Sequence, residues 1–310
     1  MPNFVDVTNR VDKQHLKKYS LTIAYIGRKS LYAFRNRVND IVSFFGSISN
    51  IEIMYVDTST TEISDVSDIL NKARIIIPSD NISIVEAVNT AISSASAPLV
   101  LVMSVNYRPS VVNTKGIRGL FSSEPTLLCI TPTISYQGKR IRETVKLGVM
   151  KDRLEWVILE NAKNPASLTP NNFLGIYNKN LFNSIGGFLP ELPTAISLVE
   201  FGIRAWSSGC IIVSAEERDF VVDKIADLEI STSVSEPEKS EPTFKYFLSK
   251  KPLWTIFKDI ASIPLFMLTF RFKEVSKVFR ELKVYLKNKN KIFIFVPELE
   301  KIASIISYYE

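Results

Sequence analysis

Histidine and cysteine are almost absent from this chain of 310 residues, which contains one histidine and two cysteines. The single histidine, His15, leaves too few residues for a histidine-based metal centre or a Ser-His-Asp triad. Cys129 and Cys210 each lie among apolar neighbours, so we expect reduced core residues and not a disulfide framework. Reduced cysteines, together with a polar first stretch without the pattern of a signal peptide, predict a cytoplasmic protein.

Long apolar runs are also missing. The apolar stretch at 260–270 contains 11 uncharged residues after Lys258 and Asp259, which is too short to span a bilayer. Positive charge gathers in the same part of the chain, because residues 244–310 contain 13 Lys and Arg against 6 Asp and Glu, whereas the rest contains 25 against 26. A basic end predicts an acidic partner surface, either anionic lipid or nucleic acid. We expect no nucleic acid, since the chain has no recognised binding motif and no basic stripe elsewhere.

Strands and helices alternate over the first hundred residues. Apolar runs predict strands at 21–27, 51–57, 73–78 and 98–105. Helical spacing predicts helices at 30–45, 64–73 and 82–96. This alternation predicts a doubly wound, Rossmann-like sheet, in which ligands bind beyond the carboxyl ends of the strands. Three segments follow those ends: Gly27-Arg28-Lys29, Asp57-Thr58-Ser59 and Ser104-Val105-Asn106.

The pattern changes after about residue 125. The pattern predicts a mixed or antiparallel section with short strands at 126–136, 146–150, 155–160 and 210–215. It also predicts a strand that runs into a short helix over 172–188, and a helix over 198–209 that is ended by Gly209. Residues 229–243 are rich in Ser, Glu and Pro, which predicts a linker or mobile loop. We therefore expect an α/β domain over 1–228, this linker, and a basic amphipathic helical tail over 244–310.

Residues 186–209, GGFLPELPTAISLVEFGIRAWSSG, combine a Gly-Gly-Phe turn with Glu-Phe-Gly-Ile-Arg-Ala-Trp at a fixed distance. This stretch resembles the acceptor-side segment of family-2 glycosyltransferases, and the match extends in the family's order over roughly residues 20–225. The resemblance implies a GT-A fold, which is a Rossmann-like mixed sheet flanked by helices, here with a C-terminal helical appendage. It also implies transfer of a sugar from a nucleotide-sugar donor.

The resemblance assigns several positions to the donor. Gly27 and Arg28 stand in the loop that binds the nucleotide, and Asp57 matches the first acid of the segment that contacts base and ribose. Asp57 could equally be a simple turn residue at a strand end.

The metal motif of the family, Asp-x-Asp, is replaced. Ser104 and Asn106 occupy its two acidic positions. A hydroxyl and a carboxamide carry no negative charge, so a Mg²⁺ or Mn²⁺ site would be degraded, and we expect no metal ligands here. Arg108 could then pair with the diphosphate in place of the cation; the alternative is a plain surface arginine.

The catalytic base of the family is replaced as well. The acidic pair that supplies it in the family falls on Ser197 and Leu198. Glu200 and Glu191 are the nearby acids and therefore the candidate catalytic residues, although on a helix Glu200 points about 200° away from Leu198. In the alternative interpretation Glu200 is an ordinary helix residue, and Arg204 orients the local structure through an ion pair.

The C-terminal part predicts a membrane-surface element. Residues 245–258 resemble the segment that follows the catalytic domain in bacterial and archaeal members that build cell-surface polysaccharides on lipid carriers. Helical spacing over 271–291 places six apolar residues on one face, bordered by basic ones: Phe272, Val275, Val278, Phe279, Leu282 and Leu286. That pattern is typical of a helix lying in the membrane interface. The alternatives are packing on the domain or dimerisation.

The sequence thus predicts a glycosyltransferase-like protein of the hexosyltransferase type. It would transfer a sugar from a nucleotide-sugar to a lipid-linked or other glycan acceptor in cell-surface polysaccharide synthesis, without a metal, as a peripheral protein on the cytoplasmic face of the membrane. The alternative is an inactive pseudo-glycosyltransferase that binds a glycan or scaffolds a protein partner. A third interpretation is a Rossmann-like nucleotide-binding protein with no link to glycans. A carboxylate beside the acceptor pocket would favour the active enzyme.

Overall fold

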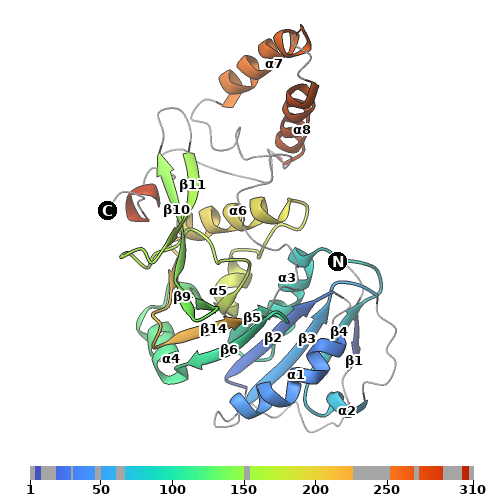
Figure 1. The fold of residues 1–310 in the computed structure, drawn as a ribbon, viewed down its shortest axis with the longest axis vertical. Helices are drawn as coiled ribbons and strands as arrows, with labels where there is room; N and C mark the ends of the chain where they lie inside the picture. The colour runs from blue at the N-terminus through green and yellow to red at the C-terminus, as the bar shows by residue number, and fades with distance from the viewer. Residues whose placement is uncertain are drawn as a thin grey trace.

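The chain forms three sheets and flanking helices in the computed structural model (Figure 1). The structure describes residues 4–7, 19–28, 31–45, 50–60, 67–149, 154–225, 252–268, 272–288 and 302–306. The predicted linker at 229–243 lies outside the described residues, so the boundary between domain and tail stays a prediction.

The largest sheet has eight strands in the order β1-β4-β3-β2-β5-β12-β7-β13. Their bounds are β1 Phe4–Val7, β2 Leu21–Gly27, β3 Ile51–Asp57, β4 Arg74–Pro78, β5 Leu99–Ser104, β7 Leu127–Thr131, β12 Gly175–Asn178 and β13 Ile211–Ser214. β1 and β12 run antiparallel to their neighbours, and the other neighbouring pairs run parallel. This mixed sheet flanked by helices confirms the predicted GT-A-like, Rossmann-like class.

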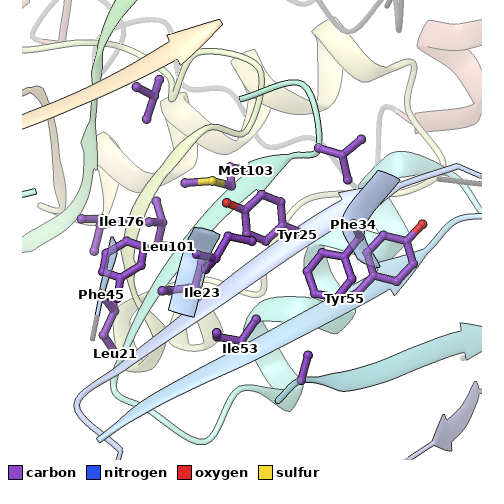
Figure 2. Close-up of a cluster of buried hydrophobic side chains, with 14 of the residues drawn as sticks. Leu21, Ile23, Tyr25, Phe34, Phe45, Ile53, Tyr55, Leu101, Met103 and Ile176 are labelled. Atoms are coloured by element: carbon purple, nitrogen blue, oxygen red, sulfur yellow. The ribbon is translucent and has the colours of Figure 1, made fainter. Parts of the chain in front are cut away.

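Both faces of the central strands are buried, which explains their nearly continuous apolar sequence. In β2, Ile23 and Tyr25 belong to one core cluster, whereas Ala24 and Ile26 belong to the cluster on the other face. Helix α1 (Leu31–Phe44) covers the first face and α3 (Ile84–Ser94) the second. Figure 2 shows the first cluster, in which the ring of Phe34 from α1 stacks on Tyr55 with centroids 4.9 Å apart.

The predicted helices of the first hundred residues form with small changes of bounds. α3 begins with a capping box, in which Ser83 and Glu86 each bind the other's backbone N–H. The helix predicted over 64–73 is α2 (Ser67–Leu70) in the described residues, and the chain turns at 71–72 into β4.

A four-stranded sheet, which the sequence pattern did not predict, lies beside the main one. Its order is β6-β14-β8-β9. Its strands are β6 Tyr107–Val112, β8 Thr133–Tyr136, β9 Lys139–Ile141 and β14 Phe220–Lys224, and α4 (Thr114–Ser123) follows β6. The single strand expected over 126–136 is therefore wrong. Pro132 separates β7 in the main sheet from β8 in the small one, because proline cannot donate a hydrogen bond to a continuing ladder.

The later half contains a separate two-stranded β-hairpin and two helices, α5 (Lys179–Ser184) and α6 (Thr194–Ser207), that cover the same face of the main sheet as α3. β10 (Glu143–Val149) and β11 (Leu154–Glu160) pair antiparallel, and α5 follows β12. α6 begins before the predicted residue 198 and is followed by Gly209 at a φ of 76°. That left-handed position is the reason for the glycine and confirms the predicted helix end. Gly202 is needed inside α6, because a Cβ there would collide with the carbonyl oxygen of Leu168.

Helices α7 (Pro252–Leu268) and α8 (Phe272–Asn288) contact each other at one end of the molecule (Figure 1). Among the described residues, no helix has both the length and the apolar composition required to cross a membrane.

Residues 302–306, beyond these helices, return to the α/β domain. Ile302, Ala303 and Ile306 are buried in a third core cluster together with Val145 of β10 and Val199 of α6. The side-chain amide of Asn164 also donates to the Ile305 carbonyl at 3.3 Å. The last described segment is therefore part of the domain core.

We predict that Ile306→Ala lowers the free energy of unfolding by about 2–5 kcal/mol, because it empties a fully buried site. Urea denaturation followed by far-UV circular dichroism measures the change. Ile305→Ala is the matched control, since Ile305 is 47% exposed and its truncation should change stability by less than about 0.5 kcal/mol. Equal effects of the two substitutions would show that the segment does not pack on the domain.

Candidate functional site

Three of the predicted segments meet at one edge of the main sheet. In the parallel register Gly27 pairs with Asp57, and Ile26 pairs with Ser104, so β2, β3 and β5 end side by side. The carboxyl edge of a parallel sheet is where α/β proteins bind ligands, and the structure brings the predicted segments together at this edge.

Asp57 is fully buried at the end of β3 and builds the turn that follows. One carboxylate oxygen accepts from the backbone N–H of Ser59 at 3.0 Å and from its hydroxyl at 2.9 Å, and the other accepts from the Tyr55 hydroxyl at 3.0 Å. The Thr58 N–H donates to the Gly27 carbonyl at 2.9 Å, which ties this turn to the end of β2. The turn role of Asp57 is confirmed, and its contact with a nucleotide stays a prediction.

Ser104 and Asn106 lie at the end of β5, where the chain turns into β6. The Asn106 N–H donates to the Ser104 hydroxyl at 3.3 Å. Neither side chain is anionic, and within the described ranges no three His, Cys, Asp or Glu side chains gather as a metal site would require. A hydroxyl and a carboxamide do not fit Mg²⁺ or Mn²⁺, which prefer anionic oxygen ligands.

Cationic side chains lie near this edge. Arg28 is exposed directly after β2, and Arg108 of β6 is 61% exposed and pairs with Asp223 at 3.2 Å. Lys224, at the end of β14, was not predicted from the sequence. Its ammonium lies 5.2 Å from the centroid of the Tyr136 ring, and the next residue donates its backbone N–H to the Asn106 carbonyl at 2.8 Å. A lysine therefore stands next to the turn that contains Asn106.

Glu143, the first residue of β10, is a half-buried carboxyl group that the sequence reasoning missed. Its backbone carbonyl accepts from the Ser214 hydroxyl at 2.9 Å, and that hydroxyl lies 3.0 Å from the Thr131 hydroxyl. Thr131 and Ser214 end β7 and β13, so Glu143 is fixed to the same carboxyl edge.

The environment of Glu143 perturbs its ionisation. Burial is the largest cause and raises the pKa of Glu143 above its ordinary 4.5; the hydrogen bond from Asn171 lowers it, the Glu160 charge raises it, and Lys224 lowers it. Burial also raises the pKa of Tyr107, with a contribution from the Glu143 charge. Glu143, Tyr107 and Lys224 thus lie close enough to influence one another. A carboxyl group with a raised pKa at a ligand-binding edge is a candidate general base.

The loop that brings Asn171 to Glu143 is strained. Its side-chain amide donates to one carboxylate oxygen of Glu143. The next two residues, Asn172 and Phe173, have φ angles of 48° and 64°, which is unusual for the bulky Phe173. The Phe173 ring packs edge-on against Phe188 at 4.9 Å, which helps to hold this conformation. Such strained backbone is enriched at functional sites.

Glu200 takes part in a structural ion pair. Both of its oxygens accept from the guanidinium of Arg204 at 2.8 Å, and Glu200 is only 4% exposed. Arg204 also donates to the Ile185 carbonyl and, at 2.7 Å, to the Gly187 carbonyl. The predicted alternative for Arg204, an ion pair that orients the local structure, is confirmed: the pair fastens the Gly-Gly-Phe turn to α6.

Asn89 of α3 holds the same turn from the other side. Its amide donates to the Phe188 carbonyl at 2.7 Å, and its oxygen accepts from the Phe188 N–H at 2.9 Å. Gly187 has a φ of 66°, and a Cβ there would lie 2.9 Å from the Asn89 oxygen. The motif that carries the sequence resemblance is therefore a packed structural turn.

Ser197 and Leu198, which the sequence resemblance placed at the position of a base, are both fully buried near the beginning of α6. Glu191 lies exposed in the turn before α6. The catalytic roles of Glu191 and Glu200 stay predictions, and Glu143 is a further acid at the carboxyl edge, beside the structural Asp57.

A shallow pocket opens at the opposite edge of the sheet. Leu21 and Leu99, the first residues of β2 and β5, lie in its wall. This pocket therefore faces away from the carboxyl ends and is not part of the candidate site.

No family model matches the chain, and no curated protein is similar to it in sequence. Solved structures similar to it include S. aureus TarS, at 15% identity and a TM-score of 0.48, with 67% of this chain and 37% of TarS covered. TarS 1–349 in complex with UDP-GlcNAc has 15% identity and a TM-score of 0.47, with 69% and 61% covered. The mannosyltransferase PcManGT from Pyrobaculum calidifontis, in complex with GDP-Man and Mn²⁺, has 10% identity and a TM-score of 0.45, with 95% and 77% covered.

The chain thus spans little more than a third of TarS and about three fifths of its 1–349 fragment. At these identities and scores the likeness concerns the arrangement of helices and strands, and it assigns no activity.

We predict that Arg204→Met lowers the free energy of unfolding by about 3 kcal/mol, because it leaves the buried Glu200 carboxylate without its partner. The double variant Glu200→Leu/Arg204→Met should be more stable than Arg204→Met alone. Arg108→Met, which breaks an exposed pair, is the control and should cost less than about 1 kcal/mol. Chemical denaturation distinguishes these values, and a neutral Arg204→Met would contradict the structural role of the pair.

We predict that Glu143→Gln stabilises the protein at about pH 7 and has no effect near pH 4. The folded-state pKa is raised, so the stability that Glu143 contributes is present below its unfolded pKa and is lost as pH rises through the folded pKa. Glutamine removes the burial penalty of the carboxylate and can still accept from Asn171. Thermal unfolding across this pH range measures the difference, with the exposed Glu217→Gln as control. Destabilisation at neutral pH would contradict the assigned environment.

Proposed function

We propose that this chain transfers a sugar from a nucleotide-sugar donor to a glycan acceptor at the carboxyl edge of the main sheet, without a divalent cation. The observation that carries the proposal is Glu143, a half-buried carboxyl group with a raised pKa that is fixed to the edge where β2, β3 and β5 end. This edge is where a sheet of this class binds its ligands.

The residues of the edge divide into two roles. The loops after β2 and β3, at Gly27, Arg28 and Asp57, would receive the nucleotide. Ser104, Asn106 and Lys224 would receive the diphosphate, with the ammonium of Lys224 supplying the positive charge that the degraded metal motif no longer binds. Arg108 is a weaker candidate for this role, because Asp223 already neutralises it.

Glu143 would act as the general base. The acceptor hydroxyl attacks the anomeric carbon, the bond from that carbon to the diphosphate oxygen breaks, and the hydroxyl proton passes to the Glu143 carboxylate. The leaving nucleoside diphosphate keeps the bonding electron pair, and Lys224 stabilises its charge. Asn171 and its strained loop would hold the carboxylate in position.

We propose a lipid-linked glycan of cell-surface polysaccharide synthesis as the acceptor. Supporting this class are the exposed apolar side chains of α7 and α8, which are suited to a membrane surface.

The second candidate function is a pseudo-glycosyltransferase that binds a glycan or scaffolds a protein partner. It is favoured by the structural use of Asp57 and Glu200, whose carboxylates build a turn and an ion pair, and by the burial of Ser197 and Leu198. The two functions differ in donor binding and turnover.

We predict micromolar binding of one nucleotide-sugar that persists in EDTA. Calorimetry of the full chain against UDP-, GDP- and dTDP-sugars, each with Mn²⁺ and with EDTA, provides the measurement. Lys224→Met should weaken binding at least about tenfold, because it removes the cation beside the diphosphate, whereas Lys283→Met in α8 should leave it unchanged. Glu143→Gln should bind the donor normally but release nucleoside diphosphate about 10²–10⁴ times more slowly.

Each outcome selects between the functions. No binding to any donor in either condition would overturn the transferase and leave the scaffold. Donor binding with no turnover, and no effect of Glu143→Gln, would support a binding protein. Binding that requires Mn²⁺ would overturn the metal-independent mechanism.

A further inference from the structure

Helix α7 exposes one apolar stripe. Phe257, Ile260 and Met267 are 46–63% exposed, and Pro264 between them is also exposed. These four positions are spaced by three, four and three residues, which places them on one face of a helix. Scattered exposed apolar residues need no explanation, but a continuous stripe on one face does.

Helix α8 exposes a second stripe. Phe272, Phe279 and Leu286 follow one another at intervals of seven residues and are 53–58% exposed. Beside this stripe, Val278 is buried and Val275 is half-buried. The apolar face of α8 is therefore wider than the part that is buried, and α8 packs against α7 (Figure 1).

Charges around the stripe of α8 have a consistent order. At about 100° per residue, the exposed Lys273 lies next to Phe272, and the exposed Arg280 and Lys283 border the Phe279 position. Glu274 is half-buried and lies about 200° from Phe272. On α7 the half-buried Asp259 lies about 100° from Ile260, closer to the stripe than the exposed Lys258. The exposed stripe of α8 is thus bordered by cations, with Glu274 turned away from it.

We propose that the exposed stripes of α7 and α8, here called the hairpin surface, bind an anionic phospholipid bilayer and lie in its interface. An apolar stripe enters the boundary of headgroups and acyl chains, and flanking Lys and Arg contact anionic headgroups. A second copy of the chain would bring the cations of α8 together around its own apolar stripe. The charge order on α8 therefore selects lipid over self-association. This inference does not depend on sugar transfer.

The test is sedimentation of the full chain with vesicles of phosphatidylcholine, alone or with about one third phosphatidylglycerol. The fraction bound should rise at least about tenfold with the anionic lipid and fall in high salt, which screens exposed charges. Phe279→Asp/Leu286→Asp should abolish binding, and Lys273→Glu/Lys283→Glu should remove the preference for the anionic lipid. Leu120→Asp is the matched control, because Leu120 is an exposed apolar residue of α4 away from the hairpin surface.

Circular dichroism shows whether each variant is folded, and light scattering gives its oligomeric state. Equal binding to both vesicles, no binding to either, or loss of binding in Leu120→Asp would overturn the proposal. A wild-type dimer that Phe279→Asp/Leu286→Asp converts to a monomer would show that a second copy covers this surface instead. Calorimetry with the nucleotide-sugars should give the same result for the hairpin variants as for the wild type, so failure here is separate from failure of the proposed transfer.

Discussion

The register of β2 between β3 and β5 is the constraint on which the rest of the structure depends. Tyr25 faces Tyr55 and Met103 in one core cluster, and the alternate residues fill the other. A slip of one residue would turn every side chain of β2 to the wrong face, so burial on both sides fixes the pairing. The same register brings the carboxyl ends of the strands together and, through β7 and β13, sets the position at which Glu143 begins β10.

Local patterns predicted the parts of the fold that bury residues on both faces. The strands around Tyr25 and Tyr55 and the helix opened by Ser83 have strong periodicity or a cap, which act over a few residues. The small sheet escaped prediction because its strands are short and its pairing is non-local: β14 pairs with β6, more than a hundred residues earlier. The division of 126–136 into two strands depends on Pro132, a single residue that does not interrupt the apolar pattern of the sequence.

The parts of the candidate site that depend on local sequence or on strand order could also be predicted. The edge at Gly27, Asp57 and Ser104 follows from the topology of parallel strands, and the ion pair of Arg204 with Glu200 follows from helical spacing. Glu143 could not be found this way, because its neighbours Asn171 and Lys224 are distant in sequence and its raised pKa is a property of their meeting. A lone acid at the start of an apolar strand was the only signal in the sequence.

The return of residues 302–306 changes what the C-terminal part of the chain is. Before α7, the chain is held to the domain at Ile225, whose N–H donates to the Asn106 carbonyl. After α8, it is held again by Ile302 and Ile306, which pack with residues of α6 and β10. In chain order the two helices therefore lie between two segments that are both packed in the α/β domain. A shortened protein that stops at residue 225 would lose part of its own core and expose Val199 and Ile203, so the α/β domain and helices α7 and α8 cannot be separated by a single cut.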